Sequence, residues 1–205
     1  MHENSGPWRS DYRVAQVTTR LIRRGALLLV ACGLVWGVLP VIPTQGEETA
    51  EYPVKLAFLY QFAQFVRWPP AAFETPTSPL VVCVAGQDPF DPDLEQELLN
   101  RTIDQHAIAI MSVKRGANLR NCHMVFVPAP ESKQAASIID SLRGSSVLTI
   151  GETKGFAERG GIINFTIEKN KLHFEINLDA VKQTPLTISS KVLAIAKIVR
   201  DPPHP

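Results

Sequence analysis

The chain has 205 residues, of which 45% are hydrophobic and 20% are charged, an ordinary composition for a globular protein with a buried core. The formal net charge is +1, but the first 46 residues hold five arginines and two acidic residues, which leaves 16 basic and 18 acidic residues in the remainder. Residues 47–205 therefore lack the excess positive charge of nucleic-acid-binding proteins, and nucleic acid is excluded as a partner.

Residues 1–46 have the pattern of a secretory signal peptide. Three arginines within residues 20–24 precede an apolar run at residues 25–42, and small residues and two glutamates follow it. This order is typical of an export signal, here with cleavage expected near Gly46. Two alternatives remain open. One is a retained membrane anchor, since 18 apolar residues are the lower limit for spanning a bilayer. The other is lipid modification of Cys32, which ends a short lipobox-like sequence.

The next segment predicts an aromatic helix followed by short elements. Residues 52–66 have apolar side chains at helical spacing, and the sequence Trp68-Pro69-Pro70 ends the pattern. The predicted apolar stripe of this helix consists of Val54, Phe58, Phe62, Phe65 and Val66. The elements expected after it are a strand at Leu80–Ala85, a helix at Asp93–Leu99, and strands at Ile108–Val113 and Met124–Val127.

The second half of the chain continues this alternation and then predicts a hairpin. The expected elements are a helix at Ser132–Leu142, strands at Val147–Ile150, Ile162–Ile167 and Leu172–Leu178, and a final helix at Ser189–Val199 capped by Ser189 or Ser190. Lys169-Asn170 is the predicted hairpin turn. Alternating helices and strands followed by a hairpin predict one α/β domain at residues 47–205, a three-layer-like sandwich with a mixed β-sheet flanked by helices.

Two cysteines, Cys83 and Cys122, remain once the signal is removed. In an oxidising compartment outside the cytoplasm, a pair of cysteines suggests one disulfide. Cys83 lies in a predicted strand and Cys122 precedes another, so adjacent strands would bring them together. Two buried thiols are the alternative. A metal site is not expected, because two separated cysteines do not make a ligand set.

The sequence predicts no catalytic centre and no cofactor. Histidines follow at positions 106, 123, 173 and 204, and none lies at metal-ligand spacing from another. His123 is next to Cys122, but neighbouring strand residues point to opposite faces, so a Cys–His nucleophile is not expected. The glycine-rich residues 151–161 are interpreted as loop geometry and not as a phosphate site, because no helix clearly begins there. We therefore expect a protein that is not an enzyme.

One strand offers a candidate ligand site. His173, Glu175 and Asn177 alternate with apolar residues, so they share the polar face of strand 172–178. This face could present a ligand or partner site, and plain solvent exposure is the alternative. The helix at residues 52–66 carries more aromatic residues than a core stripe needs, so a partly exposed patch is expected there.

Segments between Tyr52 and Arg200 also carry a family resemblance. The first is Val54-Lys-Leu-Ala-Phe-Leu-Tyr-Gln-Phe-Ala-Gln-Phe-Val-Arg-Trp-Pro69, which resembles the opening signature of the YfiR-like family of bacterial periplasmic proteins. The further matching segments, in the family's order, are Val82-Cys-Val-Ala-Gly86, Cys122 before a short strand, Val147-Leu-Thr-Ile-Gly151 with Gly155-Phe156 and Gly160-Gly161, and Phe174-Glu-Ile-Asn-Leu178 with Leu186-Thr-Ile-Ser-Ser-Lys191.

The resemblance implies a periplasmic repressor with an α/β sandwich fold that forms a homodimer. Its partner would be the periplasmic domain of an inner-membrane diguanylate cyclase or another receptor, and an outer-membrane lipoprotein would sequester it. Release of the cyclase would raise cyclic di-GMP and lead to biofilm formation. The resemblance also implies that a Cys83–Cys122 disulfide supports the fold and the activity. Because the family's second cysteine pair is missing here, any redox regulation would depend on this one bond.

The mechanism implied by the resemblance is a population shift, in which a repressor binds only the inactive state of its target. An apolar aromatic patch could supply the necessary difference in affinity, so Tyr60, Phe65 and Trp68 are the candidates for partner contact, with core packing as the alternative. A second hypothesis is a periplasmic small-ligand-binding component of another receptor system.

Overall fold

A computed structural model describes residues 48–202 of the chain. The segment 1–46, with the predicted export signal and Cys32, lies outside the described residues, so its cleavage, retention or lipid modification stays a prediction. Within residues 48–202, no helix has both the length and the apolar character that crossing a bilayer requires.

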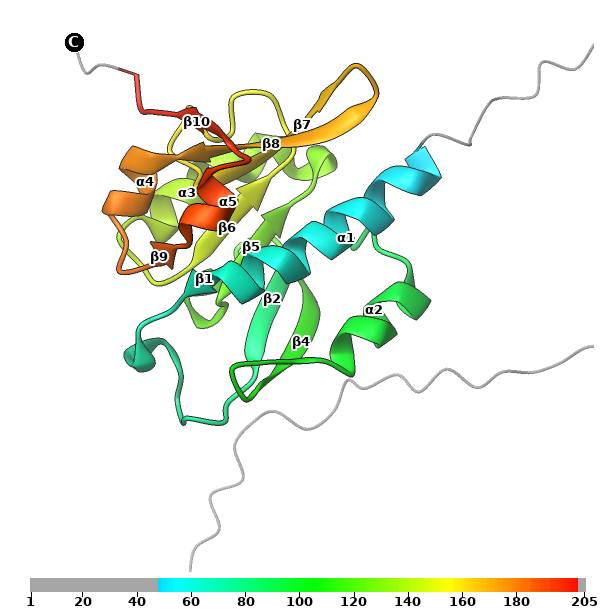
Figure 1. Ribbon diagram of the computed structural model, residues 1–205, viewed down its shortest axis with the longest axis vertical. Coiled ribbons are helices and arrows are strands. Elements are labelled where there is room, and N and C mark those ends of the chain that lie inside the picture. The colour runs from blue at the N-terminus through cyan, green and yellow to red at the C-terminus, as the bar shows by residue number, and fades with distance from the viewer. Residues whose placement is uncertain (1–47, 203–205) are drawn as a thin grey trace, which may run out of the picture. The chain divides into compact units, whose positions relative to one another are not determined.

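A mixed sheet forms the centre of the described chain (Figure 1). Its strands are β2 (Leu80–Ala85), β3 (Thr102–Ile103), β4 (His106–Val113), β5 (Met124–Val127), β6 (Leu148–Gly151), β7 (Ile163–Glu168), β8 (Lys171–Asn177) and β10 (Lys197–Val199). They lie in the order β10-β8-β7-β6-β5-β2-β4-β3. The β7–β8 and β3–β4 pairs are antiparallel and the others are parallel, so the predicted mixed sheet is confirmed.

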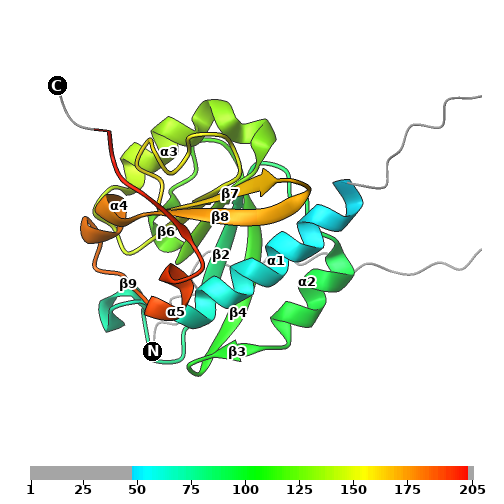
Figure 2. The same ribbon diagram turned by 45° about the horizontal axis from the view of Figure 1, so that its top comes forward.

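Helices cover both faces of this sheet, as the predicted sandwich requires (Figure 2). They are α1 (Glu48–Phe65), α2 (Pro92–Leu99), α3 (Ala135–Leu142), α4 (Leu178–Lys182) and α5 (Ser190–Leu193). Side chains of α1 and α2 pack on one face in a cluster with alternate residues of β2 and β5, and α3 packs on the other face with the residues between them. β5 is buried at every position, which is typical of a parallel strand covered on both sides.

The buried stripe of α1 differs in part from the predicted one. Phe62 is buried as expected, and its ring lies 5.1 Å from Phe174 and 5.8 Å from Phe165. Val66 is buried too, but the helix ends one residue before it. Val54, however, is 45% exposed, so its placement in the stripe was wrong. Among residues 51–65, the buried positions of the helix are Lys55, Leu56, Leu59, Phe62 and Ala63. The helix is therefore rotated so that a lysine near its amino end faces inward.

The predicted helix at Ser189–Val199 is wrong beyond its first turn. Ser189 does cap a helix, because its hydroxyl accepts from the Lys191 N–H, but α5 ends at Leu193. The segment Lys197–Val199 forms β10, which pairs in parallel with β8. The apolar residues read as a helical face include β-branched ones that suit a strand, and the free edge of β8 supplies hydrogen-bond partners that a local pattern does not reveal.

Cys83 and Cys122 form the predicted disulfide, with their Cα atoms 5.9 Å apart. Cys83 lies in β2, and Cys122 precedes the adjacent β5, so neighbouring parallel strands bring them together. Both residues are buried in the cluster on the α3 side of the sheet. The alternative of two free buried thiols is thereby removed.

Candidate functional site

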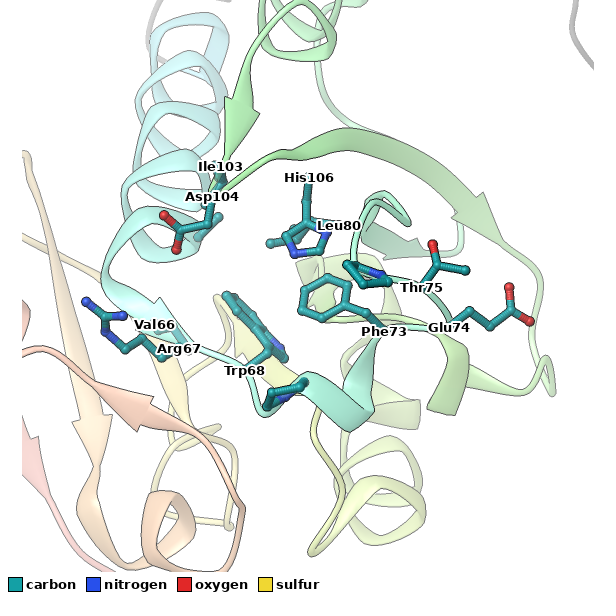
Figure 3. A pocket seen from close by; sticks show the side chains of 13 residues that line it. Val66, Arg67, Trp68, Phe73, Glu74, Thr75, Leu80, Ile103, Asp104 and His106 are labelled. Atoms are coloured by element: carbon teal, nitrogen blue, oxygen red, sulfur yellow. The ribbon is translucent and has the colours of Figure 1, made fainter.

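A cavity of about 420 Å³ lies beside the carboxyl end of α1, and we call it the aromatic pocket (Figure 3). Its lining consists of Ala63, Val66, Arg67, Trp68, Pro70, Phe73, Glu74, Thr75, Pro76, Leu80, Ile103, Asp104 and His106. These residues come from the end of α1, the loop that follows it, the start of β2 and the turn between β3 and β4. The pocket thus combines segments that are far apart in the sequence.

The chain after α1 folds locally in a way that places aromatic rings in this pocket. The helix ends at Phe65, and Val66–Arg67 forms β1, which pairs antiparallel with β9 (Thr187–Ile188). A 3-10 turn at Pro70–Ala72 follows, with a proline at its start, where a missing N–H costs nothing. This turn reverses the chain and leads directly into Phe73.

Phe73 is stacked between two histidine rings. Its ring centroid lies 3.8 Å from that of His106, with 10° between the planes, and 4.3 Å from that of His123, with 25° between the planes. Figure 3 shows the Phe73 and His106 rings facing each other beside Trp68. Because each ring is held by its neighbours, this wall of the pocket is fixed before any ligand or partner arrives.

His123 is fixed by its hydrogen bonds. Its Nδ1 accepts from the Val81 N–H at 3.0 Å, so its Nε2 carries the proton and donates to the Ala72 carbonyl at 3.1 Å. Burial lowers the pKa of His123 below its usual value, with the hydrogen bond to Ala72 acting against this and the nearby His106 acting with it. The ring is therefore neutral, and its hydrogen bonds hold the backbone at Val81 and Ala72 together.

Trp68 connects the pocket to the disulfide. Its indole N–H donates to the His123 carbonyl at 3.1 Å, and His123 follows Cys122 directly. The indole is half-buried and lines the aromatic pocket. A displacement of the chain at Cys122 would therefore move the acceptor that holds Trp68.

The rim of the pocket is charged, whereas its walls are largely apolar. Arg67, Glu74 and Asp104 are exposed and border the opening. Asp104 and Gln105 form a two-residue turn between β3 and β4, and both have positive φ, which fits the tight hairpin there. An apolar cavity with a charged rim has the character of a site that accepts an aromatic or aliphatic group and orients it by charge.

The three predicted partner-binding residues do not form one patch. Tyr60, Phe65 and Trp68 are all half-buried and pack against the core. Trp68 lines the pocket, whereas the Tyr60 ring lies under the Arg101 guanidinium at 5.1 Å and the Phe65 ring lies 5.9 Å from the Lys191 ammonium. Their contact with a partner stays a prediction, and Trp68 is the member best placed for it.

The predicted ligand-binding residues do not share an exposed face. His173 is exposed, but Glu175 and Asn177 are buried, so solvent exposure of the whole set was wrong. Asn177 caps α4 and donates to the Ala157 carbonyl at 2.7 Å. Glu175 accepts from Lys197 at 2.9 Å. β10 and the loop before β7 supply these partners. Ligand binding by the three residues stays a prediction. Glu175 lines a second cavity, separate from the aromatic pocket.

The glycine-rich loop after β6 shapes the core. A Cβ atom at Gly151 or at Gly161 would lie within 2.5 Å of the Phe156 ring, which is fully buried between them. These glycines therefore allow the loop to close over an aromatic ring, in agreement with the interpretation as loop geometry.

Sequence reasoning missed Phe73 and His106. The available signal was an aromatic residue three positions after Trp68-Pro69-Pro70, a turn sequence that returns the chain toward the helix end. In the described part of the chain, no group of three histidine, cysteine, aspartate or glutamate side chains could hold a metal ion.

Comparison with models of protein families finds a match that covers most of the chain. The model of a family described as YfiR/HmsC-like matches residues 52–197, which include every residue of the aromatic pocket. No curated protein matches the chain.

Proposed function

The chain belongs to the YfiR/HmsC-like family, and from this premise we propose that it represses a membrane signalling protein, a diguanylate cyclase, and so controls cyclic di-GMP and biofilm formation. Family membership supports, at the level of the family, a periplasmic regulator of a diguanylate cyclase system. The observation that carries the proposal is the family match across residues 52–197. Repression of a particular cyclase, dimer formation and a lipoprotein partner are the parts that we add.

The aromatic pocket is the proposed contact with the cyclase. Moving a two-state target from almost fully active to almost fully inactive takes about 5.5 kcal/mol of discrimination between its states. One partner aromatic side chain that buries 150–250 Å² would contribute about 4 to 6 kcal/mol at 25 cal/mol per Å². A pocket of about 420 Å³ is large enough for such an anchor. One well-placed side chain of the cyclase, bound only in the inactive state, would therefore supply a large part of this discrimination.

We place the protein among binding proteins and not among enzymes. The Cys122 sulfur is bonded to Cys83, and both ring nitrogens of His123 are engaged by backbone groups. Beside the aromatic pocket, these two side chains are therefore engaged in holding structure. Binding also explains why the pocket combines fixed apolar walls with a charged rim.

The first experiment measures cyclic di-GMP in the native bacterium with and without the gene. Repression predicts a clear rise on deletion, and restoration by the wild-type gene. An unchanged level on deletion would contradict regulation of a cyclase, while leaving the family and the compartment in place.

The second experiment tests the pocket in the same deletion strain. Trp68→Ala should fail to restore repression, because it removes the indole from the pocket wall. Trp68→Phe keeps an aromatic ring there and should restore most of it. The matched control is Ile195→Ala, since Ile195 is 70% exposed and lies outside the pocket. Thermal unfolding of each purified variant checks the fold. A folded Trp68→Ala variant that represses fully would contradict the role of the pocket.

A small-ligand-binding component of another receptor is the second candidate. The volume of the aromatic pocket falls within the range of about 300–1,000 Å³ typical of small-molecule sites. Saturable binding of a small aromatic compound to the purified protein, abolished by Trp68→Ala and accompanied by unchanged cyclic di-GMP on deletion, would favour it.

A further inference from the structure

A second cavity, of about 480 Å³, lies at the carboxyl end of β6 beside the amino-terminal half of α1. We call it the charged cleft. β6 pairs with β7 only at its last two residues, Ile150 and Gly151, and β7 continues past it with β8 as its partner. The cleft therefore opens where one parallel strand ends and its neighbour goes on, a common position for ligand sites in α/β sheets.

Carboxylates outnumber ammonium groups in the lining of the charged cleft. The acidic residues are Glu51, Glu152, Glu158, Glu168 and Glu175, and the basic ones are Lys55, Lys154 and Lys197. By formal charge, this lining has a net negative charge. Its field therefore favours a positively charged occupant.

The two buried carboxylates of the cleft, Glu152 and Glu175, each contact an ammonium group of the chain. The Lys55 ammonium, itself buried, contacts the carboxylates of Glu51 and Glu152, and the side chain of Glu152 is only 4% exposed. One lysine thus stands between two acids. Burying a carboxylate costs free energy unless the carboxylate is paired. These paired, buried ions are therefore an ordered part of the fold and not a loose cluster on the surface.

The second ammonium contact is made by an exposed side chain. Lys197 reaches Glu175 at 2.9 Å, although the lysine side chain is 62% exposed and the glutamate side chain is 8% exposed. The pKa of Lys197 is raised, first by its hydrogen bond to Glu175 and by that residue's charge, and also by the charges of Glu168 and Glu158. Three carboxylates of the cleft therefore act on one ammonium position, which is occupied by an exposed lysine that another ammonium group can displace.

Within the described residues, Asn164 has a buried polar atom without a partner, which is an independent indication of a ligand. It is fully buried and lines the cleft. Its Nδ2 donates to Glu175 at 3.3 Å, which fixes the orientation of the amide. Its Oδ1, however, has no hydrogen-bond partner among the described residues. A buried amide oxygen of this kind calls for an N–H or O–H donor.

We propose that the charged cleft binds a small aliphatic amine with two or more ammonium groups, one of them held at Glu175 beside Asn164 in place of the Lys197 ammonium. An ammonium supplies both the positive charge that the carboxylates attract and the N–H donors that an amide oxygen accepts. Carboxylates on the α1 side and on the β7–β8 side favour a ligand with more than one charge. The inference does not depend on the proposed repression of a cyclase.

The chemistry of the lining argues against other occupants. A phosphate or carboxylate ligand would meet the excess of glutamates. In the described part of the chain, no group of acidic, histidine or cysteine side chains could hold a metal ion. Lys55 and Lys197 also stand where a metal ion would need free carboxylate oxygens.

The test is calorimetric titration of the purified full chain with spermidine, with butylamine as the single-charge comparison. We expect saturable binding of spermidine, at least about tenfold tighter than that of butylamine. Glu175→Gln should weaken spermidine binding by about tenfold or more, because the amide keeps the shape of the side chain but loses its charge. Lys197→Gln should tighten it by about threefold, because the competing ammonium is gone.

Matched controls separate this site from general surface charge. Glu97→Gln and Lys133→Gln alter exposed charges outside the cleft and should leave the affinity unchanged. If Glu175→Gln does not fold, the double variant Glu158→Gln/Glu168→Gln, at exposed positions of the lining, should still weaken binding. No binding of spermidine, equal effects of cleft and control variants, or displacement of spermidine by stoichiometric magnesium would each overturn the proposal.

Discussion

The two ends of α1 border cavities of similar volume and opposite chemistry. Glu51 and Lys55 near its amino end border the charged cleft, whereas Ala63 and Val66 near its carboxyl end border the aromatic pocket. Figure 1 shows this helix crossing the sheet as one continuous element. A single helix on a single sheet therefore supports two sites that suit different ligands.

The difference shows two ways to make a fixed cavity wall. At the carboxyl end, stacked rings hold Phe73 in place, and their burial itself stabilises the fold. At the amino end, the wall consists of buried ions, whose desolvation each pair must offset. Substitutions should therefore cause moderate losses of stability at the aromatic pocket and strongly coupled losses at the charged cleft.

Removing the disulfide should have the largest effect on stability, and it should act on the aromatic-pocket end of α1. The bond joins residues 39 apart, and the chain-entropy model gives about 4 kcal/mol for a loop of this size. Cys83→Ala/Cys122→Ala should therefore lower the free energy of unfolding in urea by roughly that amount. The rate of amide hydrogen exchange should rise around His123, which is next to Cys122, and around Trp68, whose indole is hydrogen-bonded to the His123 carbonyl. An equal rise around Lys55 would contradict the separation of the two ends.

Lys55→Met tests the coupled ions at the other end. It leaves the buried carboxylate of Glu152 without its ammonium, and breaking a buried pair in this way costs about 3 kcal/mol or more. Adding Glu152→Gln should recover much of the loss, because the amide oxygen can still accept from the Ala129 N–H and the Tyr52 hydroxyl. Urea unfolding of the two single variants and the double variant measures the coupling. Additive losses would show that the ions act independently.

Phe73→Leu is the corresponding change at the aromatic pocket. It keeps an apolar side chain but loses two stacking contacts, so we expect a loss of about 1 to 2 kcal/mol in urea unfolding. The effect should add to that of Lys55→Met, since the two sites share no side-chain contact among those described. A coupling energy well above about 0.5 kcal/mol would show that α1 transmits strain between its ends.

Local patterns in the sequence predicted most of the sheet but neither cavity. Short apolar runs indicated β2, β5 and β6, and adjacent strands indicated the disulfide, because burial and pairing there depend on neighbouring positions. β10 was missed because the free edge of β8, and not its own sequence, decides its conformation.

The polar residues of β8 show why the sites were harder to predict. The alternation at Glu175 and Asn177 predicted one polar face correctly, but that face is covered by Lys197, by the loop before β7 and by Asp201. Those partners lie about 20 or more positions away in the sequence. Likewise, Trp68 and His106 meet in one pocket through a turn and a hairpin whose relative placement no periodicity encodes.

The smallest expected effect is a pH dependence confined to the aromatic pocket. The pKa of His123 is lowered in the folded state, so the unfolded chain takes up a proton near pH 6.5 that the folded chain does not. The stability contributed by neutral His123 is present above that pH and is lost as the pH falls toward the folded pKa. His123→Asn keeps an acceptor for the Val81 N–H and cannot titrate, so its stability should decrease less than that of the wild type between pH 7 and pH 5.

The comparison with the variant is necessary because Glu95 acts in the opposite direction. Burial, followed by the charge and hydrogen bond of Asp88, raises the pKa of Glu95 to about 7, so this carboxyl group favours the folded state as the pH falls. The two contributions offset each other in the wild type over this range, and only the difference between wild type and His123→Asn isolates the pocket. Identical pH profiles for the two proteins would show that His123 is not held neutral by burial. A loss of stability at acid pH that remains in His123→Asn but disappears when a lysine or glutamate of the charged cleft is replaced would instead assign the acid sensitivity to the amino end of α1.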